Sequence, residues 1–140
     1  MVAPEISSAP AVALRQLSVR RSAVAGVWTI RWSLQNTGGE LLEIISVRLP
    51  HGQFKSRQQQ FEPPLKLPAG GAVEFHIQVD CAEPPGLVTE NAFLIFNVTW
   101  LNEDWRIFAR VKVVVNARGE PQAATELVTT QKVGFSGVPN

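Results

Sequence analysis

Hydrophobic and polar residues alternate along most of this chain, with the period of two that is typical of half-buried β-strands. In 27–35, Trp28, Ile30 and Trp32 share one face, while threonine, arginine and serine residues occupy the other. The segment 72–81 alternates in the same way. Each segment therefore predicts a strand with one face in the core and the other in water.

The most hydrophobic pair of strands lies in 92–115, on both sides of a predicted turn at 101–104. Alternation predicts an inner face made of Ala92, Leu94, Phe96, Val98, Trp100, Trp105, Ile107, Ala109, Val111 and Val113. If the two tryptophans that flank the turn pair with each other, Phe96 lies opposite Ala109, and a large side chain packs against a small one. We expect this hairpin to form the centre of the fold.

Two further segments alternate less regularly. In 12–20 the apolar spacing slips from even to odd, which predicts an edge strand with a bulge or kink. In 41–49 we expect Ile45 to face the core, so that Leu42 and Ile44 face outward.

Turn residues separate these segments, and apolar residues nowhere recur at helical spacing over three turns. The predicted strands lie near residues 12–20, 27–35, 41–49, 53–61, 72–81, 90–100 and 105–116. This pattern predicts an all-β fold, an immunoglobulin-like antiparallel β-sandwich of about seven strands. A jelly roll or a small barrel is the alternative.

The length of 140 residues suits one domain with a real core. We expect this domain to cover 12–116, after a flexible lead-in at 1–11 that is rich in alanine, proline and serine. In the C-terminal tail, 117–140, the segment 125–135 is compatible with one extra strand. No signal peptide is visible at the start, and no apolar stretch approaches the roughly 20 residues that span a bilayer.

Composition restricts the function only weakly. A net charge of +1 gives no reason to expect binding to nucleic acid or to a membrane surface. The one cysteine, Cys81, cannot form an intramolecular disulfide, which is compatible with a reducing compartment such as the cytoplasm without requiring one. The sequence leaves the localisation open.

Two turn motifs give the chain a resemblance to a known family. Asn36-Thr37-Gly38 follows a strand that carries tryptophans, and Leu67-Pro68-Ala69-Gly70 precedes a later strand. Over 27–81 the chain resembles bacterial CARDB-type and related Ig-like modules, which use an N-x-G turn and an L-x-P-G-like turn at such places. Here Ala69 is an additional residue in the second motif. The resemblance implies an adhesive or spacer β-sandwich, commonly an accessory module, without an activity of its own.

The residues suggest no catalytic, cofactor-binding or metal site. A zinc site needs three or four convergent ligands, and His51 and His76 read as ordinary surface residues. Cys81 reads as a small buried side chain, because no basic residue near it in sequence would lower its pKa. Glu103 and Asp104 read as solvated turn residues.

Tryptophan is the one residue type that raises the question of a ligand. Exposed aromatic rings stack on sugars, but alternation places Trp28, Trp32, Trp100 and Trp105 on inner faces. We therefore expect these rings to pack in the core. A module that binds carbohydrate or another ligand is the alternative function.

The outer side of the central hairpin is unusually apolar. Solvated faces of sandwiches are mostly polar, and a continuous apolar patch marks a contact surface. The predicted interface residues are Leu42, Ile44, Phe93, Ile95, Arg106, Phe108 and Arg110. We expect a non-enzymatic interaction module that binds a protein partner or a second copy as a homodimer.

Two other readings of this patch stay open. In one, the tail residues Leu127, Val128, Val133 and Phe135 fold over it. In the other, the assumed register is displaced by one residue, which would exchange the inner and outer faces.

Overall fold

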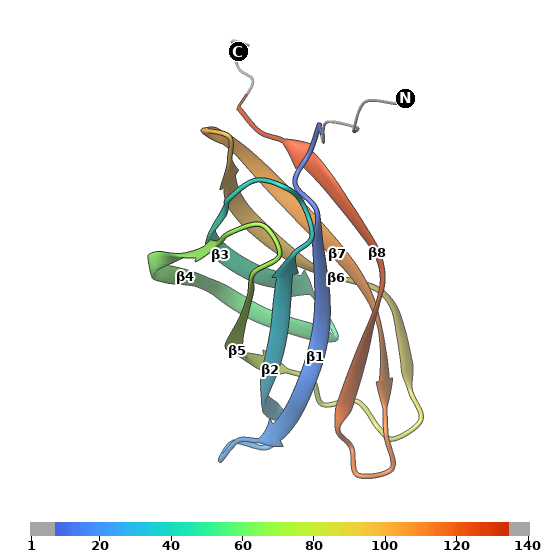
Figure 1. Ribbon diagram of the computed structural model, residues 1–140. Helices are drawn as coiled ribbons and strands as arrows, with labels where there is room; N and C mark the ends of the chain where they lie inside the picture. The colour runs from blue at the N-terminus through green and yellow to red at the C-terminus, as the bar shows by residue number, and fades with distance from the viewer. Residues whose placement is uncertain (1–7, 135–140) are drawn as a thin grey trace.

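The computed structural model of the protein describes residues 8–134, apart from the side chain of His51. In this part of the chain the regular structure is antiparallel β-sheet without a helix, and Figure 1 shows its eight strands. They are β1 (Val12–Arg21), β2 (Val27–Asn36), β3 (Leu42–His51), β4 (Phe54–Leu67), β5 (Ala72–Asp80), β6 (Val88–Trp100), β7 (Glu103–Val115) and β8 (Pro121–Lys132).

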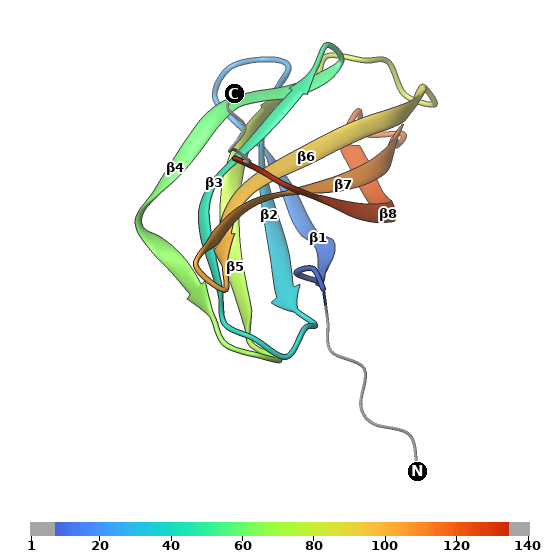
Figure 2. The same cartoon turned by 90° about the horizontal axis from the view of Figure 1, so that it is seen from above.

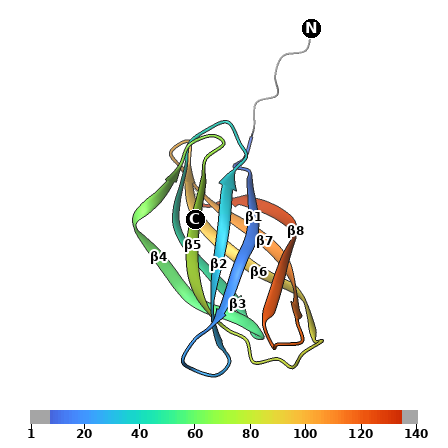
Figure 3. The same cartoon turned by 60° about the horizontal axis from the view of Figure 1, so that its bottom comes forward.

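The eight strands form a single sheet in the order β1-β2-β5-β4-β3-β6-β7-β8. The sheet curls until its end strands, β1 and β8, lie side by side, as Figures 2 and 3 show from two directions. The prediction of an all-β antiparallel fold is confirmed. The sheet is nearly closed and barrel-like, however, in place of the expected seven strands in two packed sheets. The eighth strand arises because Pro121–Lys132 pairs along β7.

Strands β4 and β5 are joined by one residue pair, Lys55 with Asp80. Aromatic packing supplements this pair: the ring centroids of Phe61 and Phe75 lie 5.7 Å apart in an edge-to-face arrangement. Phe75 in turn lies 6.0 Å from Phe96 of β6. This row of rings crosses the interior from β4 to β6. Side-chain packing therefore stabilises the contact between β4 and β5, where only one residue pair joins the backbones.

The most regular strands bury the residues that alternation predicts to be inside. The inward residues of β2 from Trp28 to Leu34 are at most 3% exposed. Those of β5 from Phe75 to Val79 are at most 5% exposed. The predicted inner faces of these strands are confirmed.

The turn of the β6–β7 hairpin is shorter than the predicted 101–104. Trp100 pairs with Glu103, so only Leu101 and Asn102 lie between the strands. Their φ angles are 51° and 60°. Positive φ at both central positions is the mark of a type I′ turn, whose twist matches that of the flanking strands.

This shorter turn changes the cross-strand partners without exchanging the faces. Phe96 lies opposite Ile107 and not opposite Ala109 as predicted, because the register differs by two residues. Trp100 and Trp105 are diagonal neighbours, and their rings still meet edge-to-face at 5.7 Å. The predicted inner face is confirmed, with Trp105 half-buried at its end.

Strand β3 contradicts the predicted faces of 41–49. Its pairing with β6 shifts between Ile44 and Ser46, so Ile45 is the extra residue of a bulge. Leu42 and Ile44 are therefore 0% exposed in the core, although we predicted them on the outer surface. A bulge adds one residue to a strand and so reverses the alternation of inward and outward side chains. The faces on one side of a bulge therefore cannot be predicted from the pattern on the other side.

Strand β4 extends beyond the predicted 53–61. Its pairing with β3 is interrupted between Gln60 and Leu65 and then resumes up to Leu67. The interruption contains Pro63 and Pro64, which have no backbone N–H to donate to a ladder.

Candidate functional site

The outer side of the β6–β7 hairpin carries most of the residues that we predicted to form an interface. This surface, called the hairpin face below, consists of Phe93, Ile95, Arg106, Phe108 and Arg110. Ile95 lies opposite Phe108, and Phe93 lies opposite Arg110. Cross-strand neighbours of this kind have Cβ atoms about 4.5–5.5 Å apart, so these side chains form one continuous patch.

Strand β3 contributes different residues to this side of the sheet than we expected. Leu42 and Ile44 are in the core, and Arg48 instead lies beside Ile95. Next to it the side chain of Ser46, 1% exposed, accepts a hydrogen bond of 2.9 Å from Asn97 Nδ2. The centre of the patch is thus bordered on β3 by an arginine and a satisfied polar pair.

The hairpin face is apolar at its centre and cationic around it. Ile95 is only 7% exposed, yet it lies outside the main core cluster. Phe93 and Phe108 are half-buried, as are the arginines around them. Arginine side chains can lay their aliphatic stems over apolar surface while the charge stays in water, and Arg48 is the cross-strand neighbour of Ile95.

Strand β8 extends the sheet and, over the described residues up to 134, leaves the hairpin face uncovered. Leu127 pairs with Arg110 and is 47% exposed, which enlarges the apolar surface. Val128 packs on the opposite side, against the core. Val133 is half-buried, and Phe135 lies outside the described residues.

The arginines of this surface have few acidic partners. Arg110 Nε lies 3.9 Å from Glu126 Oε1, and this buried nitrogen has no hydrogen-bond partner. Neither Arg48 nor Arg106 belongs to an ion pair among the described residues. Positive charge is therefore available here to a binding partner.

A groove of about 240 Å³ lies beside the hairpin face. Ile45, the bulged residue of β3, lines it together with Trp105, Arg106 and Val133. The bulge thus places one more apolar residue near the patch.

An ion pair stabilises the charges at the tip of the hairpin. Lys132 Nζ lies 2.7 Å from Glu103 Oε2, and this hydrogen bond lowers the pKa of the Glu103 carboxyl. Both groups are well exposed, so solvent weakens the interaction.

The described residues give little support for a nucleophilic cysteine or for a metal-binding site. Cys81 is buried, and burial raises the pKa of its thiol, which disfavours the reactive thiolate. His76 is exposed, whereas the side chain of His51 lies outside the description. Among the described side chains, no group of three or more His, Cys, Asp or Glu residues is placed to hold a metal ion.

The tryptophans pack mainly inside the molecule. Trp28, Trp32 and Trp100 are at most 4% exposed, and Trp105 is half-buried. Trp28 Nε1 donates a 2.8 Å hydrogen bond to the Cys81 carbonyl, whereas Trp32 Nε1 is buried without a partner. Trp105 is thus the most exposed of the four tryptophans.

Sequence reasoning missed two residues of this surface. Arg48 and Leu127 join it because β3 pairs with β6 and β8 pairs with β7. Arg48 falls on the outer face in the predicted alternation of 41–49, but its position beside Ile95 depends on the register between the strands, which alternation does not report.

No protein-family model and no curated protein sequence match this chain. Over the described residues, no helix has the length and apolar character needed to cross a membrane. The site is therefore interpreted from its own geometry.

Proposed function

We propose that this protein is a non-enzymatic interaction module that binds another protein surface through the hairpin face. The observation that carries this proposal is the continuous row of Phe93, Ile95 and Phe108 on the outer side of the sheet. Arginine and aromatic residues are the types that protein interfaces favour. Strand β8 leaves this row open, which supports a partner from outside the chain.

A second copy of the chain is the partner that we propose first. Most homo-oligomers are symmetric dimers in which the same patch meets itself, so one apolar patch is enough to build the interface. In such a dimer Phe108, opposite Ile95 on the next strand, would lie near the centre of the contact.

The test is the mass of the protein in solution after Phe108→Asp, measured by light scattering. We expect a dimer for the unchanged chain and a monomer for the variant, because a carboxylate in an apolar contact loses its hydration. Val24→Asp is the matched control: Val24 is 64% exposed in the β1–β2 turn, and this variant should stay dimeric.

Circular dichroism separates loss of assembly from loss of fold. Phe93→Asp, on the same face, provides a second variant, and it should also weaken the dimer because it places a carboxylate in the apolar contact. A monomeric unchanged chain, or a dimer that both variants leave intact, would contradict the proposal.

A module that binds carbohydrate or another ligand is the second candidate. It relies on Trp105, whose half-buried ring borders the groove beside the hairpin face. Titration with sugars should then change the tryptophan fluorescence of the chain, whereas a pure protein-interaction module should not respond.

We also propose an immunoglobulin-like relationship for the fold. The neighbours β1-β2-β5 and β3-β6-β7 follow the strand order of the two sheets of an immunoglobulin domain, with β8 as an addition. The resemblance of 27–81 to CARDB-type modules agrees with this order and with an accessory role.

A further inference from the structure

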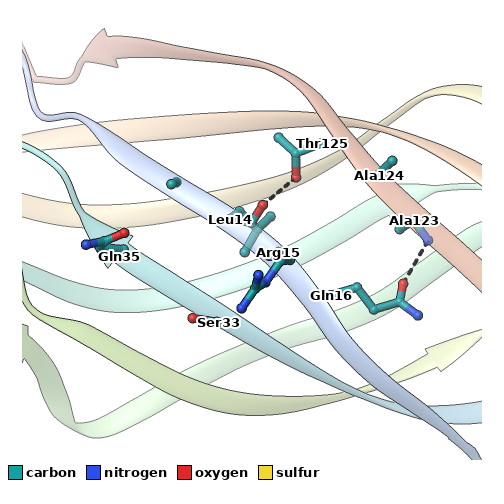
Figure 4. Close-up of a pocket in the computed structure, with 9 residues that line it drawn as sticks. Leu14, Arg15, Gln16, Ser33, Gln35, Ala123, Ala124 and Thr125 are labelled. Carbon is teal, nitrogen blue, oxygen red and sulfur yellow. Dashed lines mark hydrogen bonds between the residues drawn. The ribbon is translucent and has the colours of Figure 1, made fainter.

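The two ends of the curled sheet meet without a backbone ladder. Within the described residues β1 pairs only with β2 and β8 only with β7, yet the two strands lie side by side. Side chains join them, as Figure 4 shows. Gln16 Nε2 donates to the Pro121 carbonyl at 3.1 Å, and Gln16 Oε1 accepts from Ala123 N at 2.8 Å. Thr125 Oγ1 donates to the Leu14 carbonyl at 2.9 Å.

These bonds, called the side-chain latch below, occupy positions that a neighbouring strand would fill. A carboxamide offers one acceptor oxygen and N–H donors, as a peptide group does. Gln16 uses both to contact backbone groups on each side of Gln122. Beyond the latch the strand edges present N–H and C=O groups to which another strand can bind.

The core is less well covered beside this seam than elsewhere. On β7 the inward residues from Ile107 to Val115 are at most 2% exposed. The inward residues of β8 after Pro121 are all half-buried: Ala123, Thr125, Val128 and Thr130. These side chains lie on the strand that borders the seam, and they are only partly covered.

A groove of about 570 Å³ runs along the outer side of the seam. Pockets that hold ligands commonly measure about 300–1,000 Å³. Arg15, Ser33 and Gln35 line the groove from β1 and β2, opposite Ala124 of β8 (Figure 4). No acidic residue lines it, and Arg15 belongs to no ion pair among the described residues.

We propose that the β1–β8 seam accepts an extended segment of another protein as an additional strand, with apolar residues alternating with carboxylates. Its backbone would pair with the free strand edges, as in other cases of β-strand addition. Its inward apolar residues would cover the half-buried side chains of β8. Its outward carboxylates would lie beside Arg15, because cross-strand neighbours on one face are in contact.

Insertion requires β1 and β8 to separate by about one strand spacing, roughly 4.8 Å. The side-chain latch then opens, and the entering backbone takes over its hydrogen bonds. The latch therefore competes with the segment, and a weaker latch should bind the segment more tightly.

The probe is a capped peptide of eight residues that alternates valine with glutamate, labelled for fluorescence anisotropy and titrated with the full chain. A peptide of the same design with lysine in place of glutamate is its counterpart. We expect the glutamate peptide to bind and the lysine peptide to bind much more weakly, because Arg15 is the charged residue of the groove.

Three variants locate the site. Arg15→Glu should weaken binding of the glutamate peptide about tenfold, since it exchanges attraction for repulsion. It should strengthen binding of the lysine peptide for the opposite reason. Arg57→Glu is the control, at an exposed arginine of β4 away from the seam, and it should have little effect. Thr125→Val removes one latch hydrogen bond and should tighten binding about fivefold.

Several results would overturn the proposal. These are failure of the glutamate peptide to bind, equal weakening of its binding by Arg15→Glu and Arg57→Glu, or no effect of Thr125→Val on its binding. Loss of binding in Phe108→Asp would also overturn it, because the peptide would then occupy the hairpin face. The outcome is independent of the dimer test, which does not involve the seam.

Discussion

At the scale of single residues, Asn36 links two turns that are distant in the sequence. Its side chain is 1% exposed, and Nδ2 donates to the carbonyls of Glu40 at 2.7 Å and Leu67 at 2.9 Å. Oδ1 accepts from Gly38 N at 3.0 Å, which forms the local Asx turn. The two turn motifs, Asn36-Thr37-Gly38 and Leu67-Pro68-Ala69-Gly70, therefore contact each other through this asparagine.

We predict that Asn36→Ala lowers the free energy of unfolding by about 3 kcal/mol, because it removes two hydrogen bonds to carbonyl groups, and the bond to Leu67 is buried. Chemical denaturation measures the change. Asn116→Ala is the matched control, since Asn116 makes similar bonds at the half-buried β7–β8 turn. Asn116→Ala should lower the free energy of unfolding by about 1 kcal/mol. Equal costs at both positions would mean that burial is not what makes Asn36 important.

At the scale of elements, the β6–β7 turn holds one residue, Leu101, in a conformation that leucine rarely adopts. Leu101 has a φ of 51°, in the left-handed region that favours glycine and asparagine. The turn is nevertheless formed, because the long apolar strands on both sides pair along their length. Strand packing outweighs the local preference.

We predict that replacing Leu101-Asn102 with Asn-Gly raises the free energy of unfolding by about 1 kcal/mol, because this pair suits a type I′ turn. Urea denaturation of the double variant checks it. Ala117→Gly, in a turn where the replaced residue does not have a positive φ, is the control. It should destabilise the chain by roughly 0.5–1 kcal/mol through the unfolded state. No gain from the double variant would argue against the observed two-residue turn.

At the scale of the whole molecule, β8 protects the last strand of the central hairpin. It pairs with β7 from Trp105 to Val115, and Val128 and Ala123 pack against the core from its inner side. Pro121–Lys132 lies within the predicted C-terminal tail, for which we allowed one extra strand, and it forms an end strand of the sheet.

We predict that a chain ending at Arg118 associates in solution, because the unpaired edge of β7 can then bind another chain. Light scattering of the truncated protein measures this. Adding Phe108→Asp to the truncation separates the two possible contacts. Association through the β7 edge should persist in the combined variant, whereas a monomeric combined variant would assign the contact to the hairpin face.

Alternation by itself determined which side of each regular strand faces the core, as in Trp28 to Leu34 of β2 and in the central hairpin. The inner face can be predicted in this way because successive side chains of a strand point to opposite sides, and the apolar side is the one that is buried. Both properties belong to the single strand. An error of two residues in register, as at Phe96, leaves this face unchanged, so the faces were predicted correctly with the wrong partners.

Only the tertiary structure decided the features that depend on contacts between distant strands. The bulge at Ile45 placed Leu42 and Ile44 in the core, because one extra residue reverses the alternation. The curl of the sheet brought Gln16 to Ala123, and no local pattern in either segment encodes that contact. The candidate surfaces combine both kinds of information. Sequence selected the apolar outer residues of the hairpin, and sheet order decided their neighbours and where the sheet stays open.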